Sequence, residues 1–211
     1  YLDMNFLIKV AFVLVVLDFC SGDVTNYEKE MLLDIHNECR ANVAKGDVSG
    51  QPPATYMEAL VWNAESASKA QISADKCIFA HDTKDDRKYG DFESVGQNVA
   101  MFSGKNIFRG VELWYNEAFG FTFSNNTCSL KTCGHYTQLV WADSSELGCG
   151  LAKCVISKEN VNLLFCNYGP GGNYDGVPPY EPGETCSECQ SENICNNGLC
   201  PTFEKINFHP I

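Results

Sequence analysis

Cysteine content constrains the fold of this chain more than any other feature of its sequence. Twelve of the 211 residues are cysteines, a density typical of proteins exported to an oxidising compartment. The last four follow the pattern Cys-x2-Cys-x5-Cys-x4-Cys between Cys186 and Cys200. This stretch has too few apolar residues for a core of its own, so we expect it to be crosslinked. Disulfides are the first interpretation, because export favours them, and a four-cysteine zinc knuckle is the rival one.

Residues 4–22 have the pattern of a secretory signal peptide. Lys9 precedes an apolar run over residues 10–17, which is too short to span a bilayer but suits the apolar region of a signal. We place the cleavage after Gly22, and the alternative is a buried N-terminal helix. Neither hypothesis accounts for residues 1–3, which precede the first methionine. No later stretch is apolar for long enough to span a membrane, so the sequence predicts a secreted, extracellular protein.

The charge balance excludes two classes of partner. The formal net charge is −12 at pH 7, and so acidic a surface repels the phosphates of nucleic acids and of anionic membranes. With 45% hydrophobic and 20% charged residues, the composition is that of a globular protein. A chain of this length can build one core and a small appendage.

Three stretches have helical periodicity, and the first opens with a capping box. Thr25 and Glu28 have the spacing of that motif. The apolar residues of the three stretches recur at helical spacing: Met31, Leu32, Ile35 and Cys39; then Ala64, Ala67, Ala70, Ala74 and Cys77; then Ile107, Val111, Trp114 and Ala118.

Extended structure is predicted between and after these helices. Residues 95–101 are a strand candidate. Residues 146–154 and 161–168 predict an antiparallel hairpin joined by the polar residues 156–160. Residues 82–91 are polar and charged, hence a surface loop. Helices that flank a small antiparallel sheet predict an α+β fold with three layers.

Four segments together resemble the signature of the CAP superfamily, which comprises cysteine-rich secretory proteins, antigen 5 and plant pathogenesis-related proteins. The third and fourth are long and specific, whereas the second alone would be weak. They are residues 36–40 (His-Asn-Glu-Cys-Arg), 96–99 (Gly-Gln-Asn-Val), 134–141 (Gly-His-Tyr-Thr-Gln-Leu-Val-Trp) and 166–174 (Cys-Asn-Tyr-Gly-Pro-Gly-Gly-Asn-Tyr).

The resemblance covers most of the chain after the predicted signal. It implies the CAP fold, a three-layer α-β-α sandwich, over residues 23–180. It also implies a short disulfide-crosslinked tail over residues 181–211, similar to the hinge of the family. Within the superfamily, the chain looks most like venom-allergen-like proteins secreted by parasitic worms.

The resemblance also implies a pairing for ten of the cysteines. Removal of the signal would take Cys20 away and leave eleven, so one thiol is odd. The odd one is Cys39, which is either buried and inert or paired with a second molecule. The implied disulfides are Cys77–Cys154, Cys128–Cys133, Cys149–Cys166, Cys186–Cys195 and Cys189–Cys200.

The family holds two histidines and two acidic residues in a central cavity, and the matching positions here are His81, Gln97, Glu117 and His135. Two imidazoles and one carboxylate could hold Zn²⁺ with an open coordination position. Gln97 stands where the family has glutamate, and an amide cannot accept a proton, so general-base catalysis from that position is lost. The alternative is a hydrogen-bonded polar cluster, and no cofactor is required.

Other catalytic motifs are missing from the sequence. It contains neither His-Glu-x-x-His nor Gly-x-Ser-x-Gly, and Ser144 has no base beside it. His36 and Arg40 lie one helical turn apart and are expected to tie their helix to neighbouring backbone. The sequence therefore predicts a protein that is not an enzyme.

An aromatic segment follows the third helix. Phe119, Phe121 and Phe123 alternate there, and because exposed phenylalanines are costly, something must cover them. The cover is either the core or a ligand, since some CAP proteins bind sterols at a loop in this position and others hold fatty acids between two helices. Asn125 opens an Asn-x-Thr sequon in the polar residues that follow, which predicts a surface glycan.

The leading functional hypothesis is a secreted binding protein for a sterol or fatty acid that acts on host proteins, in host interaction or immune modulation. A zinc-dependent hydrolase or protease that uses His81, Glu117 and His135 is the alternative. A channel-blocking toxin comes last, because reptile venom relatives carry a further cysteine-rich domain after the hinge and the sequence shows none after Cys200.

Overall fold

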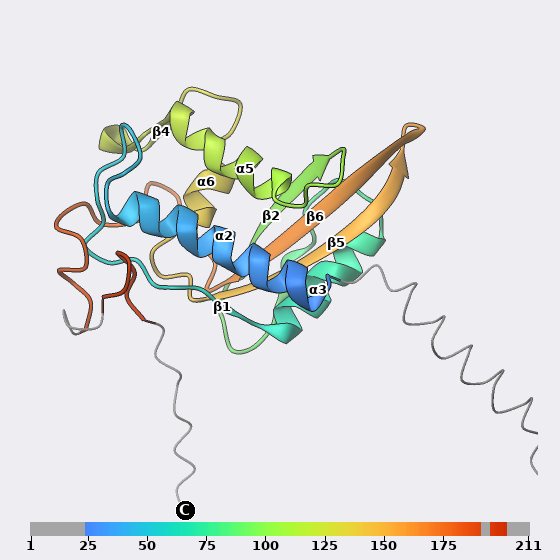
Figure 1. Cartoon of the computed structure of the whole chain (residues 1–211), viewed down its shortest axis with the longest axis horizontal. Helices are drawn as coiled ribbons and strands as arrows, with labels where there is room; N and C mark the ends of the chain where they lie inside the picture. The colour runs from blue at the N-terminus through green and yellow to red at the C-terminus, as the bar shows by residue number, and fades with distance from the viewer. Residues whose placement is uncertain (1–23, 191–194, 202–211) are drawn as a thin grey trace, which may run out of the picture.

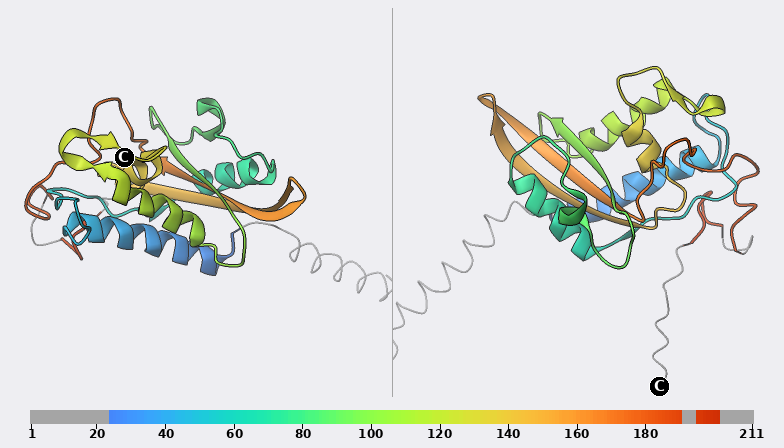
Figure 2. Two further views of the ribbon diagram at one scale, coloured as in Figure 1. Left: turned by 90° about the horizontal axis from the view of Figure 1, so that it is seen from above. Right: turned by 180° about the vertical axis from the view of Figure 1, so that it is seen from behind.

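The computed structural model describes residues 24–190 and 195–201 (Figure 1). The predicted signal peptide at residues 4–22 and the last residues of the predicted tail lie outside the described residues. Helices α2 (Asn26–Ala44) and α5 (Arg109–Tyr115) cover one face of a sheet, and α3 (Ala64–Asp75) covers the other. Figure 2 shows these three layers from above. The predicted three-layer α+β sandwich is confirmed.

The central sheet has four strands in the order β1-β5-β6-β2. Strands β5 (Glu146–Ile156) and β6 (Glu159–Gly169) form the predicted antiparallel hairpin, and β2 (Gly96–Phe102) pairs antiparallel with β6. Strand β1 (Val61–Trp62), which the sequence did not predict, pairs parallel with β5. The hairpin turn is shorter than predicted.

Two residues make that turn. Ser157 and Lys158 both have positive φ angles, 52° and 70°, which is the backbone of a tight two-residue hairpin connection. The predicted polar connection over residues 156–160 is therefore mostly strand, because Ile156 pairs with Glu159 directly across the turn.

Local capping explains where the long helices begin. The Thr25 hydroxyl accepts from the Glu28 nitrogen at 3.2 Å, and the Thr25 nitrogen donates to Glu28 Oε2 at 2.9 Å. This is the predicted capping box of α2, now confirmed. Helix α3 is capped by the Asn63 side chain, which accepts from the Ser66 nitrogen at 2.9 Å.

Two predicted segments differ from the observed ones. The predicted surface loop at residues 82–91 contains a short helix, α4 (Lys84–Arg87), and Tyr89 in it is buried. The predicted third helix is regular only as α5, and the chain then tightens into a 3-10 helix, η1 (Asn116–Gly120). A short second sheet follows, formed by β3 (Phe121–Thr122) and β4 (Thr127–Cys128). The remaining elements are η2 (Phe123–Asn125) and α6 (Gly134–Leu139).

Glycines in β5 allow α3 to lie directly on the sheet. A Cβ on Gly148 would lie 2.2 Å from the Ala67 nitrogen, and a Cβ on Gly150 would lie 2.2 Å from the Gln71 nitrogen. The Gln71 amide fixes the contact, because it donates to the Leu151 carbonyl and accepts from the Leu151 nitrogen, each at 3.0 Å. Any side chain at the two glycines would push helix and sheet apart.

All five disulfides implied by the family resemblance are present: Cys77–Cys154, Cys128–Cys133, Cys149–Cys166, Cys186–Cys195 and Cys189–Cys200. The rival zinc knuckle in the tail is therefore wrong, because its four sulfurs bond to one another. Cys39 is the free cysteine among the described residues, and it is buried. No helix in the described part of the chain has the length and hydropathy needed to cross a bilayer.

Candidate functional site

All four of the family-like sequence motifs meet in one chain of hydrogen bonds. His36 Nδ1 donates to the Leu32 carbonyl at 2.6 Å, so Nε2 accepts from the Tyr168 hydroxyl at 3.0 Å. The Asn98 amide donates to that hydroxyl at 3.2 Å and to the His135 carbonyl at 2.9 Å. This chain runs from α2 through the sheet to α6, and it fixes the position of His135.

Arg40 ties α2 to the backbone around Trp141. Its guanidinium is fully buried and donates to carbonyl oxygens that belong to residues both before β1 and after α6. The acceptors are Glu58, Leu139, Trp141, Ala142 and Ser144, at 2.6 to 3.1 Å. Together with the His36 contacts, this confirms the structural role predicted for the two residues. Burial lowers the pKa of Arg40 to about 10, still high enough to keep it charged.

The four candidate metal-site residues form two hydrogen-bonded pairs. In the first, His135 Nδ1 donates to Glu117 Oε1 at 2.7 Å. The other oxygen of Glu117 accepts from the backbone nitrogens of His135 and Tyr136, at 3.0 and 3.1 Å. The Trp114 ring stacks on the His135 ring, with centroids 6.3 Å apart. Glu117 therefore orients the imidazole and caps the first turn of α6.

The second pair depends on a residue that sequence reasoning missed. Gln97 Oε1 accepts from His81 Nδ1 and from the Asp82 backbone nitrogen, both at 3.1 Å. Its Nε2 donates to Asp82 Oδ2 at 2.8 Å and to Asn167 Oδ1 at 3.0 Å. The Asp82 side chain is only 6% exposed and pairs with Lys76 at 3.6 Å. Asp82 opens a polar stretch with no periodicity, so the sequence carried no signal for its role.

The donor set fits zinc in its chemistry, although the side chains are not gathered around one point. In both histidines Nδ1 is held by an oxygen acceptor, and neither Nε2 has a hydrogen-bond partner within residues 24–190 and 195–201. That is the arrangement in which proteins present imidazole to a metal.

No three of the candidate ligands lie together, however. In the described residues, the groups of ligand atoms within 4.8 Å of one another are His36 with Cys149 and Cys166, and Cys186 with Cys189 and Cys200. Those cysteines are disulfide-bonded, and none of the candidate zinc ligands is among them. The four side chains thus form two separate hydrogen-bonded pairs, and zinc binding by them stays a prediction.

Ser144 has no features of a nucleophile. Its side chain is fully buried. Its hydroxyl donates to the Pro170 carbonyl at 2.7 Å and accepts from Gln138 Nε2 at 3.2 Å. Both partners are structural, which agrees with the absence of a base expected from the sequence.

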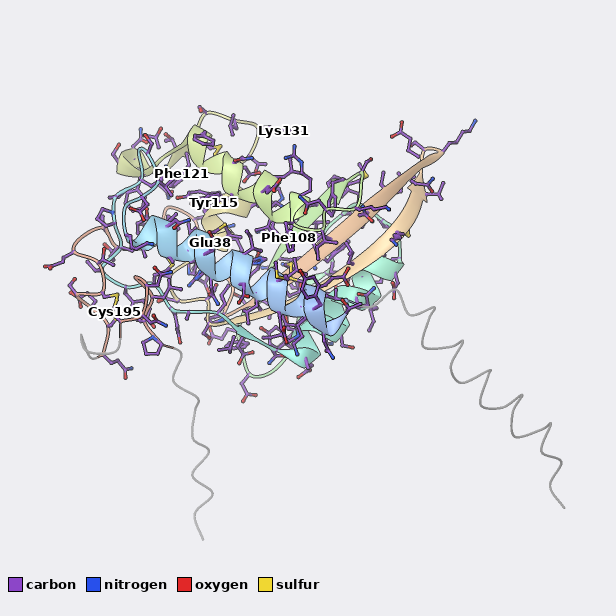
Figure 3. All side chains as sticks on the ribbon, in the orientation of Figure 1. Glu38, Phe108, Tyr115, Phe121, Lys131 and Cys195 are labelled. Carbon is purple, nitrogen blue, oxygen red and sulfur yellow. A yellow bond between two sulfur atoms is a disulfide. The ribbon has the colours of Figure 1, made fainter. Side chains whose placement is uncertain are left out.

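The three phenylalanines do not share one environment. Phe121 is 7% exposed and contacts the rings of Tyr136 and Phe123, with centroids 5.7 and 6.2 Å away. Figure 3 labels Phe121 beside the end of α5. Phe123 packs on Tyr180 at 4.6 Å, whereas Phe119 is 82% exposed. The core thus buries Phe121 and partly covers Phe123, whereas the protein itself leaves Phe119 exposed, so a ligand as the cover of Phe119 stays a prediction.

A pocket of about 270 Å³ adjoins this segment. Phe121, the Cys128–Cys133 disulfide and residues 173–177 are among its lining residues. Leu130 in the loop that this disulfide closes is 51% exposed and lies over Gly120, where a Cβ would meet its Cγ at 2.2 Å. The Asn125 side chain is exposed and accepts from the Thr127 hydroxyl at 2.7 Å. An exposed asparagine is accessible for a glycan, and glycosylation at Asn125 stays a prediction.

Comparison with known proteins identifies the family to which this sequence is similar. The model of the Cysteine-rich secretory protein family, CAP, matches residues 33–168. Scoloptoxin SSD976 of Scolopendra dehaani is 42% identical over 177 residues, which cover 82% of this chain and 83% of that protein. GLIPR1-like protein 1 of Homo sapiens is 38% identical over 180 residues, covering 82% and 71% respectively.

Solved structures agree with the sequence relatives. Venom allergen-like protein 4 of Schistosoma mansoni is 35% identical with a TM-score of 0.66, and the match covers 76% of this chain and 97% of that one. The structure of NaASP2 with Zn²⁺ is 28% identical with a TM-score of 0.68, and the match covers 86% and 98%. The similar sequences include Scolopendra and human proteins, so the narrower expectation of a parasitic-worm protein is not confirmed.

Proposed function

Because this chain belongs to the CAP family of cysteine-rich secretory proteins, we propose that it is an exported, non-enzymatic protein that binds a sterol or a fatty acid outside the cell. Its five disulfides suit the extracellular space. Some relatives are named as venom toxins or allergens, which supports an action on the molecules of another organism, including host proteins.

The exposure of Phe119 is the observation that carries the lipid proposal. A phenylalanine that is 82% exposed leaves most of its apolar surface in water. Leu130 is also exposed and lies over Gly120, the residue next to Phe119. Two exposed apolar side chains thus lie at or beside neighbouring residues at the end of η1. Contiguous exposed apolar surface is typical of sites that bind lipids or other apolar partners.

The adjoining pocket supports a sterol more than a fatty acid. Its volume of about 270 Å³ is close to the lower end of the ~300–1,000 Å³ range of ligand sites. It therefore suits one end of a rigid ring system better than a whole lipid. Phe121 supplies an aromatic wall, and the Cys128–Cys133 loop connects the pocket to Leu130. Binding would come chiefly from buried apolar area.

Uptake of radiolabelled cholesterol and palmitate by the purified protein tests this proposal. We expect the Phe119→Ser, Leu130→Ser double variant to bind cholesterol roughly tenfold more weakly, because two apolar contacts are lost. Phe79→Ser is the matched control, since Phe79 is also exposed, at 54%, but belongs to the segment after α3. Failure to take up either lipid would overturn the proposal, as would equal losses in both variants.

Zinc binding without turnover is a second candidate function, favoured by the orientation of the two imidazoles. His81 and His135 would supply Nε2 donors, and Glu117 and Gln97 would hold the rings through Nδ1. Bound zinc would act as a Lewis acid toward water. Gln97 offers no base for that water, because its oxygen accepts two hydrogen bonds and its nitrogen donates two. We therefore propose binding rather than hydrolysis.

Calorimetric titration with zinc chloride tests this second candidate. Glu117→Gln should lower zinc affinity about 10- to 100-fold, as for other carboxylates that orient a metal-binding histidine. Glu112→Gln on the exposed side of α5 removes the same charge and should leave the affinity unchanged. Undetectable zinc uptake by the unmodified protein would reject zinc binding, and chelator-sensitive cleavage of peptide or ester substrates would revive the hydrolase hypothesis.

A further inference from the structure

The crosslinked tail forms one wall of a groove that shares Val177 with the pocket beside Phe121. This tail groove has a volume of about 550 Å³. Its walls are residues 55–56 after α2, residues 141–143 after α6, and residues 177–182 with Glu188 in the tail. In Figure 1 the tail segments, drawn in red, lie at the end of the sandwich away from the β5–β6 turn.

Backbone hydrogen bonds hold these walls together. The Thr55 nitrogen donates to the Glu181 carbonyl at 3.0 Å, and the Glu188 nitrogen donates to the Thr55 carbonyl at 3.0 Å. The Ala142 nitrogen donates to the Pro179 carbonyl at 2.8 Å. The disulfides Cys186–Cys195 and Cys189–Cys200 fix the tail on either side of Glu188, and Cys195 is labelled in Figure 3. The groove is therefore formed before any partner arrives, which lowers the entropic cost of binding.

The side chains that line the tail groove are aromatic, proline and acidic. Tyr56, Trp141 and Tyr180 contribute rings, alongside three prolines of residues 178–182. Tyr56 is half-buried, whereas Trp141 and Tyr180 are buried and present only an edge to the groove. Asp143, Glu181 and Glu188 contribute exposed carboxylates from three separate segments. No lysine, arginine or histidine is among the lining residues of the described chain.

Charges of both signs lie beneath the groove, and the acidic one adjoins Tyr56. Tyr56 donates its hydroxyl to Glu58 Oε2 at 3.0 Å. Burial raises the pKa of Glu58, and the nearby Asp143 raises it further, although Arg40 acts against this. The Arg40 guanidinium lies behind the groove wall, because it donates to the carbonyls of Trp141 and Ala142, but it is fully buried and does not line the groove. A cation in the groove would relieve the repulsion among these carboxylates.

We propose that the tail groove binds a peptide segment of a partner protein that carries arginine or lysine side chains. Carboxylates attract the cationic groups, and the half-buried ring of Tyr56 can accept one of them by cation–π contact. Three carboxylates on three segments suit several cationic side chains along a chain better than a single small amine. The proposal does not rest on lipid or zinc binding, although Val177 lines both this groove and the pocket beside Phe121. It gives the crosslinked tail a binding role.

Titration with a blocked arginine pentapeptide at low salt tests the proposal, with the citrulline pentapeptide as a neutral ligand of the same shape. The groove variant combines Asp143→Asn, Glu181→Gln and Glu188→Gln. The matched control combines Glu30→Gln, Asp34→Asn and Glu159→Gln, which are exposed acids outside the groove. Both variants lose three negative charges. The indole NMR signals of Trp141, Trp62 and Trp114 report where the peptide binds.

We expect the arginine peptide to bind, the citrulline peptide to bind at least tenfold more weakly, and the Trp141 signal alone to shift. The groove variant should lose roughly tenfold in affinity, because three exposed ion pairs are removed at once, and the control variant should bind as the unmodified protein does. Equal losses in the two variants would show attraction to net charge only and would overturn the proposal. Absence of binding, or an unchanged Trp141 signal, would overturn it as well.

Discussion

The side chain of Gln97 is the hydrogen-bonding complement of Asp82. Its Nε2 donates to Asp82 Oδ2 at 2.8 Å, while its Oε1 accepts from the Asp82 backbone nitrogen at 3.1 Å. The same Nε2 also donates to Asn167 Oδ1 at 3.0 Å. A carboxylate at position 97 would place an acceptor oxygen against two other acceptors, Asp82 Oδ2 and Asn167 Oδ1. The amide thus belongs to a local network in which the acidic group is at position 82.

Gln97→Glu should therefore destabilise the protein. At pH 7 we expect the free energy of unfolding to fall by about 1–3 kcal/mol, because Asp82 loses a donor in a buried network and gains a like charge. Repulsion from Asp82 raises the pKa of the introduced carboxyl, so the loss is present above that pKa and is relieved as the pH falls through it. Urea denaturation at pH 7 and pH 4 measures both effects.

Asp82→Asn in the same background is the matched test of the pairing. An amide at position 82 can donate to the introduced carboxylate, so the double variant should recover part of the stability at pH 7. Additive losses from the two substitutions would contradict a direct coupling between these side chains.

The sequence predicted elements whose cause is local. The capping box at Thr25 and Glu28 requires only four consecutive residues, and the β5–β6 hairpin was predicted from two neighbouring stretches separated by a short polar one. The disulfide pairs came from the family resemblance rather than from spacing. These features depend on short stretches or on whole motifs, and both are visible in a single sequence.

Features that depend on a meeting of distant segments were not predictable. Asp82 becomes part of the site only because the segment after α3 crosses the start of β2. Phe119 is exposed and Phe121 is buried because the chain passes from a 3-10 helix to a strand between them. The sequence interpretation treated the three phenylalanines as if they shared one backbone conformation. The tail groove needs residues 55–56, 141–143 and 177–188 together, and no pattern within one segment indicates it.

Arg40→Lys should be strongly destabilising. An ammonium group has three donors, and it cannot reproduce the fork of contacts to five carbonyl oxygens. Buried carbonyls would be left without partners, so we expect a loss of about 3 kcal/mol or more in the free energy of unfolding. Thermal and urea denaturation measure it. Arg109→Lys is the control, because Arg109 is exposed and pairs only with Glu112, and a similar loss there would contradict the argument.

Cys39 should be inert in the folded protein. Its side chain is buried, and burial raises the pKa of the thiol to about 12, with Glu38 adding to the shift. The reactive thiolate is therefore scarce at pH 8. We expect no reaction with a disulfide reagent such as dithionitrobenzoate until the protein is unfolded in guanidinium. Rapid labelling of the folded protein, or a covalent dimer that Cys39→Ser abolishes, would support pairing with a second molecule instead.

His36 should make stability depend on pH between about 6.5 and 4. Burial lowers the pKa of His36 from 6.5 to about 4, the hydrogen bond to the Leu32 carbonyl opposes the shift, and Arg40 adds to it. The unfolded chain therefore binds a proton in this window that the folded protein excludes. The contribution to stability is complete above pH 6.5 and is lost as the pH falls through the window, by up to about 3 kcal/mol.

His36→Gln keeps a neutral hydrogen-bonding side chain, so the stability difference between it and the unmodified protein should shrink as the pH falls. Urea denaturation from pH 8 to pH 4 measures that difference, with His81→Gln as the control at an exposed histidine. A difference that stays constant over this range would mean that the buried imidazole is not held neutral.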